Sequence, residues 1–124
     1  MRIVFKDFPL PSHKLAPLAH EAARCAGAQG KYWAYHDRLF DKQPSFRRDD
    51  LLGYAAELGL DREAFAQCLD QRRFAGDVER DIAQAQALGV NSTPAFLING
   101  RPVLGAISVD EFRSIVEDAL KGRR

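Results

Sequence analysis

Cysteine is the residue type in this chain best suited to covalent chemistry, and the sequence contains two, Cys25 and Cys68. They lie too far apart to form a Cys-X-X-Cys pair, in which a thiolate at a helix N-terminus attacks a disulfide and a second cysteine resolves the product. Both fall inside predicted helices, on apolar faces. These surroundings favour two buried, unreactive thiols; a structural disulfide between two helices is the alternative, because pairing cannot be deduced from sequence. We therefore expect no catalytic residue in this chain.

The sequence indicates neither a metal site nor a cofactor. Its three histidines are scattered, and no spacing of Cys and His resembles a zinc site. Dinucleotide-binding, phosphate-binding and nucleophile-elbow motifs are absent from the sequence. We expect Tyr32, Trp33 and Phe40 to fill a helical core, with His36 as a core or boundary residue.

Charge and hydropathy exclude two classes of partner. The formal net charge is +1, and the basic residues do not gather on one face, so we expect no nucleic-acid binding. No stretch approaches the roughly 20 apolar residues that cross a bilayer, so we expect no membrane insertion. No signal peptide precedes Arg2, because the apolar run that follows is short and ends at Lys6.

Six segments carry apolar residues at helical spacing. Five of them lie before residue 90, and the sixth lies near the end of the chain. We expect helices at about 17–26, 31–41, 49–58, 61–69, 74–88 and 109–121.

Several helix boundaries have specific signals. Asp49 or Asp50 is expected to cap the third helix and Asp61 the fourth. Ser108 and Glu111 are predicted to form a capping box at the start of the last helix. In this motif the Ser108 side chain accepts the backbone N–H of Glu111, and the Glu111 side chain accepts the backbone N–H of Ser108. Ile107 and Phe112 stand at the hydrophobic-staple positions beside this cap.

Strands are predicted at the two ends of the chain. Residues 2–5 alternate weakly and predict a strand that buries Ile3 and Phe5. Residues 95–98 and 101–104 flank Asn99-Gly100, which favours a tight hairpin. The order is therefore strand, about five helices, hairpin and helix, which predicts an α/β fold with a small mixed sheet.

Three strings of residues show a family resemblance. GVNSTPAFLINGRPVLG (89–105) resembles the cis-proline strand and hairpin of thioredoxin-fold proteins. VFKDFPLP (4–11) and AARCAGAQGKYWAYHDRLF (22–40) resemble the DsbA-like thiol–disulfide oxidoreductases. The resemblance implies an incomplete thioredoxin-like fold, with residues 1–8 and 90–122 as the thioredoxin-like part and residues 12–89 as a helical insertion.

The resemblance also implies site residues. In this family the loop at Thr93-Pro94 holds a cis proline, faces the redox sulfurs and binds extended substrates. Some relatives have a disulfide between cysteines similar to Cys25 and Cys68. The family's Cys-X-X-Cys would lie upstream of the first strand, which predicts a fragment or divergent form that is inactive alone.

The resemblance suggests function, location and partners. We expect a protein thiol–disulfide oxidoreductase acting on protein or peptide thiols, in a family that usually works in the periplasm or otherwise outside the cytoplasm. A redox-inactive peptide-binding module and a relative of the kappa-class glutathione transferases are the alternatives. Because a central strand of the sheet would be missing, we expect a homodimer that associates through exposed strands.

Overall fold

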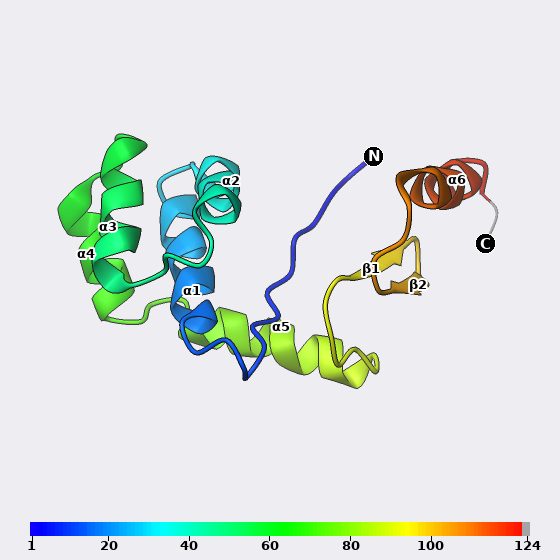
Figure 1. Ribbon diagram of the computed structural model, residues 1–124, viewed down its shortest axis with the longest axis horizontal. Helices are drawn as coiled ribbons and strands as arrows, with labels where there is room; N and C mark the ends of the chain where they lie inside the picture. Colours follow the sequence, from blue (N-terminus) through cyan, green and yellow to red (C-terminus); the bar gives the residue numbers. More distant parts are fainter. Residues whose placement is uncertain (123–124) are drawn as a thin grey trace. The chain divides into compact units, whose positions relative to one another are not determined.

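A computed structural model describes residues 1–122 of the chain (Figure 1). The chain forms two compact units, Met1–Gln84 and the residues from Ala85 onward, and each is described here by itself. The elements follow the order α1 (Ala16–Gly27), α2 (Tyr32–Lys42), α3 (Arg48–Glu57), α4 (Arg62–Asp70), α5 (Ala75–Ala87), β1 (Ala95–Ile98), β2 (Arg101–Leu104) and α6 (Val109–Leu120). The predicted order of five helices, a hairpin and a last helix is confirmed.

The first unit is a helical body built around α1. The buried face of α1 consists mostly of alanine, whose small side chain lets neighbouring helices approach closely. Larger buried side chains then fill the space between α2, α3 and α4, chiefly Tyr35, Leu51, Phe65 and Leu69. The Tyr35 hydroxyl is not left unpaired in this core, because it donates a 2.9 Å hydrogen bond to the carbonyl of Leu51.

Helix boundaries depend on local side-chain chemistry. Asp61 caps α4 as predicted, because its carboxylate accepts the backbone N–H of Ala64 at 3.0 Å. The predicted cap of α3 is wrong: Arg47 is the N-cap residue, and Asp50 accepts the Arg47 backbone N–H at 3.1 Å. Asp50 therefore acts from the third helical position rather than as the cap itself.

The second unit contains the hairpin and α6. Strands β1 and β2 pair antiparallel, with Ala95 opposite Leu104 and Ile98 opposite Arg101. Asn99 and Gly100 both have positive φ, at 48° and 85°, as the predicted two-residue turn requires. Ser108 caps α6, since its Oγ accepts the Glu111 backbone N–H at 3.1 Å.

The predicted strand at residues 2–5 does not form. Ile3 and Phe5, which the alternation pattern placed in the core, are exposed. Within residues 1–122, the strands are β1 and β2, and residues 2–5 adopt neither helix nor strand. A strand exists through its ladder of backbone hydrogen bonds, so a weakly alternating segment without a paired neighbour stays irregular. The expected mixed sheet is therefore a two-stranded antiparallel sheet.

The predicted grouping of residues 1–8 with residues 90–122 concerns how the two units meet. It stays a prediction, as does the assignment of residues 12–89 to a separate insertion.

Candidate functional site

Thr93 and Pro94 lie on an exposed loop directly before β1. The peptide bond between them is cis. The Pro94 carbonyl accepts a 2.9 Å hydrogen bond from the backbone N–H of Gly105, which follows β2. Gly105 has φ of +87°, a conformation that favours glycine. This bond extends the hairpin by one further contact and fixes Pro94 beside the end of β2.

An open apolar pocket of about 320 Å³ lies beside Pro94. Its lining comes from the loop before β1, from β1, from the loop between β2 and α6, and from the start of α6: Pro94, Phe96, Ala106, Ile107, Val109 and Phe112. The rings of Phe96 and Phe112 meet edge to face, with centroids 5.1 Å apart. The pocket can therefore accept an apolar group next to the exposed backbone of Thr93.

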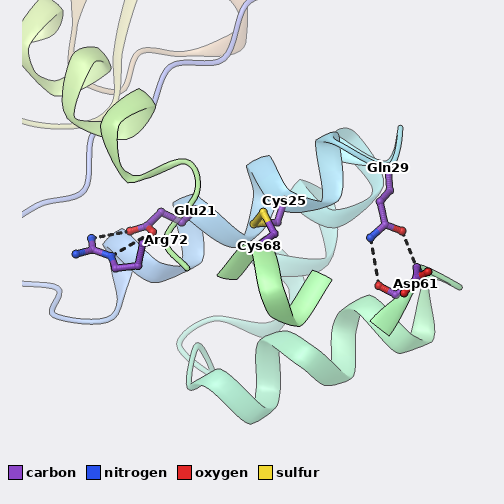
Figure 2. The surroundings of a disulfide bond; sticks show 6 residues. All are labelled: Glu21, Cys25, Gln29, Asp61, Cys68 and Arg72. Atoms are coloured by element: carbon purple, nitrogen blue, oxygen red, sulfur yellow. Dashed lines mark hydrogen bonds and ion pairs between the residues drawn. A yellow bond between two sulfur atoms is a disulfide. The ribbon is translucent and has the colours of Figure 1, made fainter. Parts of the chain in front are cut away.

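Cys25 and Cys68 form a disulfide between α1 and α4, with their Cα atoms 5.9 Å apart (Figure 2). The preference for two separate thiols is therefore wrong, and the structural disulfide is the pairing that the structure contains. Both residues are buried, at 1% and 6% exposure. A disulfide exchanges only when a thiolate can reach one of its sulfurs, so this burial protects the bond from attack.

Polar contacts flank the disulfide on both sides (Figure 2). On one side, the Arg72 guanidinium donates to the buried Glu21 carboxylate at 2.9 Å. On the other, the Gln29 side-chain amide donates to the Asp61 carbonyl at 3.2 Å and accepts the Asp61 backbone N–H at 2.8 Å. The disulfide joins α1 to α4 directly, and the two polar contacts join residues of α1 and the turn after it to residues just outside the two ends of α4.

A cluster of charged side chains joins the segment before α1 to the helical body. Asp7 is almost fully buried, and its carboxylate oxygens meet His20 Nδ1 at 2.8 Å and Arg24 Nε at 2.6 Å. Arg24 also donates to Asp81 of α5 at 2.8 Å, and Asp81 accepts the Asp7 backbone N–H at 2.8 Å. Burial alone would raise the pKa of Asp7, but the hydrogen bonds and charges of His20 and Arg24 outweigh burial and lower it.

Comparison with known proteins then gives the family. The family model described as thioredoxin, Thioredoxin_4, matches residues 1–118. The chain belongs to the DsbA/thioredoxin-like family. The resemblance read from the cis-proline hairpin and from the segments 4–11 and 22–40 is therefore confirmed, and so is the thioredoxin-like α/β fold with a helical insertion.

Individual relatives extend the comparison. A thioredoxin-like oxidoreductase from Silicibacter pomeroyi DSS-3 has a similar structure, with a TM-score of 0.83 and 29% identity over 95% of this chain and 68% of that one. Disulfide bond formation protein D of Bacillus subtilis is 30% identical over 74% of this chain and 44% of its own length. Na⁺/H⁺ antiporter NhaA of Herminiimonas arsenicoxydans is 39% identical over 93% of this chain. The chain spans 18% of that antiporter's length, and about the same share of a second antiporter, from Salinispora arenicola.

In this family member the aromatic side chains of α2 do not all enter the core. Tyr35 is the fully buried one, whereas Trp33 and Phe40 are 48% and 58% exposed. The prediction that Trp33 and Phe40 fill the helical core is therefore wrong. The ring of Phe5 lies 4.7 Å from the His36 ring and 6.3 Å from that of Trp33, between centroids. His36 is partly exposed, as expected of a boundary residue.

Two groups of residues in the structure were not predicted from the sequence. One is the cluster around Asp7, whose only signal is an acidic residue between Phe5 and Phe8 in an apolar segment. The other is the apolar pocket, for which the staple residues Ile107 and Phe112 beside the hairpin gave a partial signal. In residues 1–122, no helix is long and apolar enough to cross a bilayer. The same residues contain no group of three or more side chains placed to hold a metal ion.

Proposed function

We propose that this chain forms the substrate-binding part of a protein thiol–disulfide oxidoreductase, with an extended protein or peptide thiol lying against Thr93 and Pro94. One observation carries the proposal: an apolar pocket adjoins the exposed Thr93-Pro94 backbone in a chain of the DsbA/thioredoxin-like family. An extended substrate would offer backbone groups to Thr93 and place one apolar side chain in the pocket that Phe96 and Phe112 line.

The chain's own sulfurs do not take part in the proposed exchange. Dithiol–disulfide exchange needs an accessible thiolate, and both sulfurs of this chain are buried in one bond. The chain therefore contributes binding and orientation, and a redox-active cysteine pair has to come from another source. We accordingly expect no turnover in an insulin-reduction assay with this chain alone.

The pocket gives the direct test. We expect an extended peptide with a central leucine to shift the amide resonances of Thr93 and Phe96 in a titration of labelled protein. Phe96→Ala should weaken this binding at least several-fold, because Phe96 forms a wall of the pocket. Leu97→Ala is the matched control, since Leu97 is the next residue of β1 and points to the other face of the strand. Equal effects of the two variants, or shifts confined to other residues, would contradict the proposal.

Two alternatives share this fold. A redox-inactive module would bind peptides through the same Thr93-Pro94 edge. It would show no thiol–disulfide exchange even when a redox-active cysteine pair is supplied. A kappa-class relative would respond to glutathione instead of to an extended peptide. Parallel titrations with reduced glutathione and with the peptide distinguish the kappa-class relative, which would bind glutathione, from the oxidoreductase part and the redox-inactive module, which would both bind the peptide.

A second candidate role follows from the relatives named as antiporters. Three of them are 37–39% identical to this sequence over 93–100% of its length, which amounts to 18–19% of theirs. We infer that a thioredoxin-like module of this kind also serves within a longer antiporter polypeptide. An antibody against the chain tests this role by immunoblot of source cells. A band far above 13.9 kDa supports it, and a single band at that mass contradicts it.

A further inference from the structure

The segment before α1 has little apolar contact to hold it in place. Met1, Ile3 and Val4 are exposed, and residues 1–10 adopt no helix or strand. Asp7 is the exception, because it is 2% exposed in a segment whose other members are exposed or partly exposed. A carboxylate is an unfavourable residue to bury unless its charge is compensated. The position of Asp7 therefore depends on the groups that surround it.

Those groups come from three elements of the first unit. His20 and Arg24 of α1 bind the two carboxylate oxygens of Asp7, and Asp81 of α5 binds its backbone N–H. Lys6 Nζ lies 3.9 Å from Asp81. The remaining titratable neighbour is Tyr32 of α2, whose pKa is raised by burial and then by the charge of Asp7.

We propose that Asp7, His20, Arg24 and Asp81 form an electrostatic clasp that holds the segment before α1 against the helical body and releases it on acidification. The ionised Asp7 is the centre of the clasp, because it bridges α1 through its side chain and α5 through its backbone. Protonation would remove its attraction to Arg24 and leave a neutral carboxyl beside a guanidinium that still binds Asp81.

The direction of the pH dependence follows from the lowered pKa of Asp7. A carboxyl group whose pKa is lower in the folded state stabilises that state above its unfolded pKa of about 3.9. This contribution is lost as the pH falls through the folded pKa. The clasp is therefore closed near neutral pH and opens below about pH 4.

Phe5 connects the clasp to a measurable signal. It stands two residues before Asp7, and its ring packs edge to face on Trp33 and His36 of α2. Trp33 is the only tryptophan of the chain. Opening of the clasp frees Phe5, so Trp33 loses a neighbour and gains solvent, which shifts its fluorescence to the red.

Trp33 emission and far-UV circular dichroism, followed together from pH 7 to pH 2.5, test the clasp. In the wild-type chain we expect the emission to shift at a higher pH than any loss of helix signal, because the disulfide holds α1 to α4. Asp7→Asn should show the shifted emission already at pH 7 and no further acid step. Asp70→Asn is the matched control: it removes the exposed Arg48–Asp70 pair of the same unit and should keep the wild-type transition.

A second pair of variants covers the case in which Asp7→Asn does not fold. Arg24→Gln should shift the emission at pH 7, whereas Arg24→Lys, which keeps the positive charge, should retain most of the native emission. Native emission in Asp7→Asn or Arg24→Gln at pH 7, with an unchanged acid step, would overturn the proposal. A shift of the Trp33 emission at the same pH as the loss of helix signal in the wild-type chain would overturn the proposal as well, because it would indicate general unfolding.

Discussion

Arg72 illustrates how one residue can serve two structural needs that conflict. It follows α4 with φ of 51°, in the left-handed region that glycine adopts most easily. Its backbone N–H bonds to the Leu69 carbonyl at 3.1 Å, and the next N–H bonds to the Cys68 carbonyl, which is the pattern of a glycine-type helix end. The side chain nevertheless has to be arginine-like, because it pairs with the buried Glu21 carboxylate.

Substitution of Arg72 separates these two needs. Relief of the backbone by Arg72→Gly is worth about 1 kcal/mol, whereas loss of the partner of a buried carboxylate costs about 3–5 kcal/mol when the pair is fully desolvated. Arg72 is largely exposed, so solvent reduces the second figure. We expect Arg72→Gly to lower the free energy of unfolding by about 1–2 kcal/mol in urea titrations.

The double variant Glu21→Gln/Arg72→Gly provides the control, because it removes the buried charge together with its partner. It should recover most of the stability that Arg72→Gly loses. A single Arg72→Gly variant as stable as the wild type would show that the ion pair contributes nothing.

At the residue scale, the sequence singles out residues that a family motif surrounds and gives no signal where distant residues meet. The surrounding string singles out Thr93 and Pro94, whose role as a substrate-binding site stays a prediction. Asp7 was missed because its partner Asp81 lies 74 positions away, and no local pattern indicates that the two meet. The disulfide was left open for the same reason, since a pairing over 43 residues is a property of the folded chain.

The ends of helices and the hairpin turn were predicted correctly where a few adjacent residues determine them. The caps at Asp61 and Ser108 and the turn at Asn99-Gly100 each depend on a few adjacent residues, and all three are confirmed. The strand predicted at residues 2–5 was wrong because a strand forms only when it pairs with another segment, which its own sequence does not reveal. Helix α2 was placed correctly, but its inward face was not, because aromatic residues surround the helix and Tyr35 alone is buried there.

The disulfide gives a prediction about the pair α1 and α4. It closes a loop of 43 residues, and the chain-entropy model assigns such a crosslink about 4 kcal/mol. We expect reduction in denaturant, followed by refolding in reductant, to lower the free energy of unfolding by up to this amount. Far-UV circular dichroism should show helices that remain formed in the absence of denaturant, since the contacts of Glu21 and Gln29 persist.

The variant Cys25→Ala/Cys68→Ala is the control for this measurement. Its unfolding should not respond to reductant, and its stability should approach that of the reduced wild type. If alkylation shows free thiols but the wild-type unfolding midpoint does not move, the disulfide does not stabilise the helical unit.

At the scale of the whole molecule, exposed apolar residues suggest self-association. Ile3 and Val4 lie in a segment without a strand partner, and Leu97 and Leu104 are exposed on the hairpin. Exposed apolar segments with unpaired backbone groups favour pairing with another chain. We propose that two copies associate through residues 2–5, and we expect sedimentation at micromolar concentration to show a dimer.

Charge on this segment should prevent the association. Val4→Lys is expected to give a monomer, because a dimer would bury the added charge. Leu88→Lys, at an exposed apolar residue after α5, should leave the dimer intact. A wild-type chain that stays monomeric at all concentrations would contradict the proposal.

The three contacts between α1 and α4 also limit how the length of this chain can change. Glu21 and Cys25 are four residues apart in α1, so their side chains reach the same neighbour, and Gln29 follows two residues after the helix ends at Gly27. One residue inserted between Glu21 and Cys25 would rotate everything after it by about 100° about the helix axis. Cys25 would then face away from Cys68 of α4, and the turn that carries Gln29 would be displaced from Asp61 as well. Substitutions can remove these contacts one at a time, but an insertion or deletion removes at least two, so changes in length should be tolerated in the loops and not within α1.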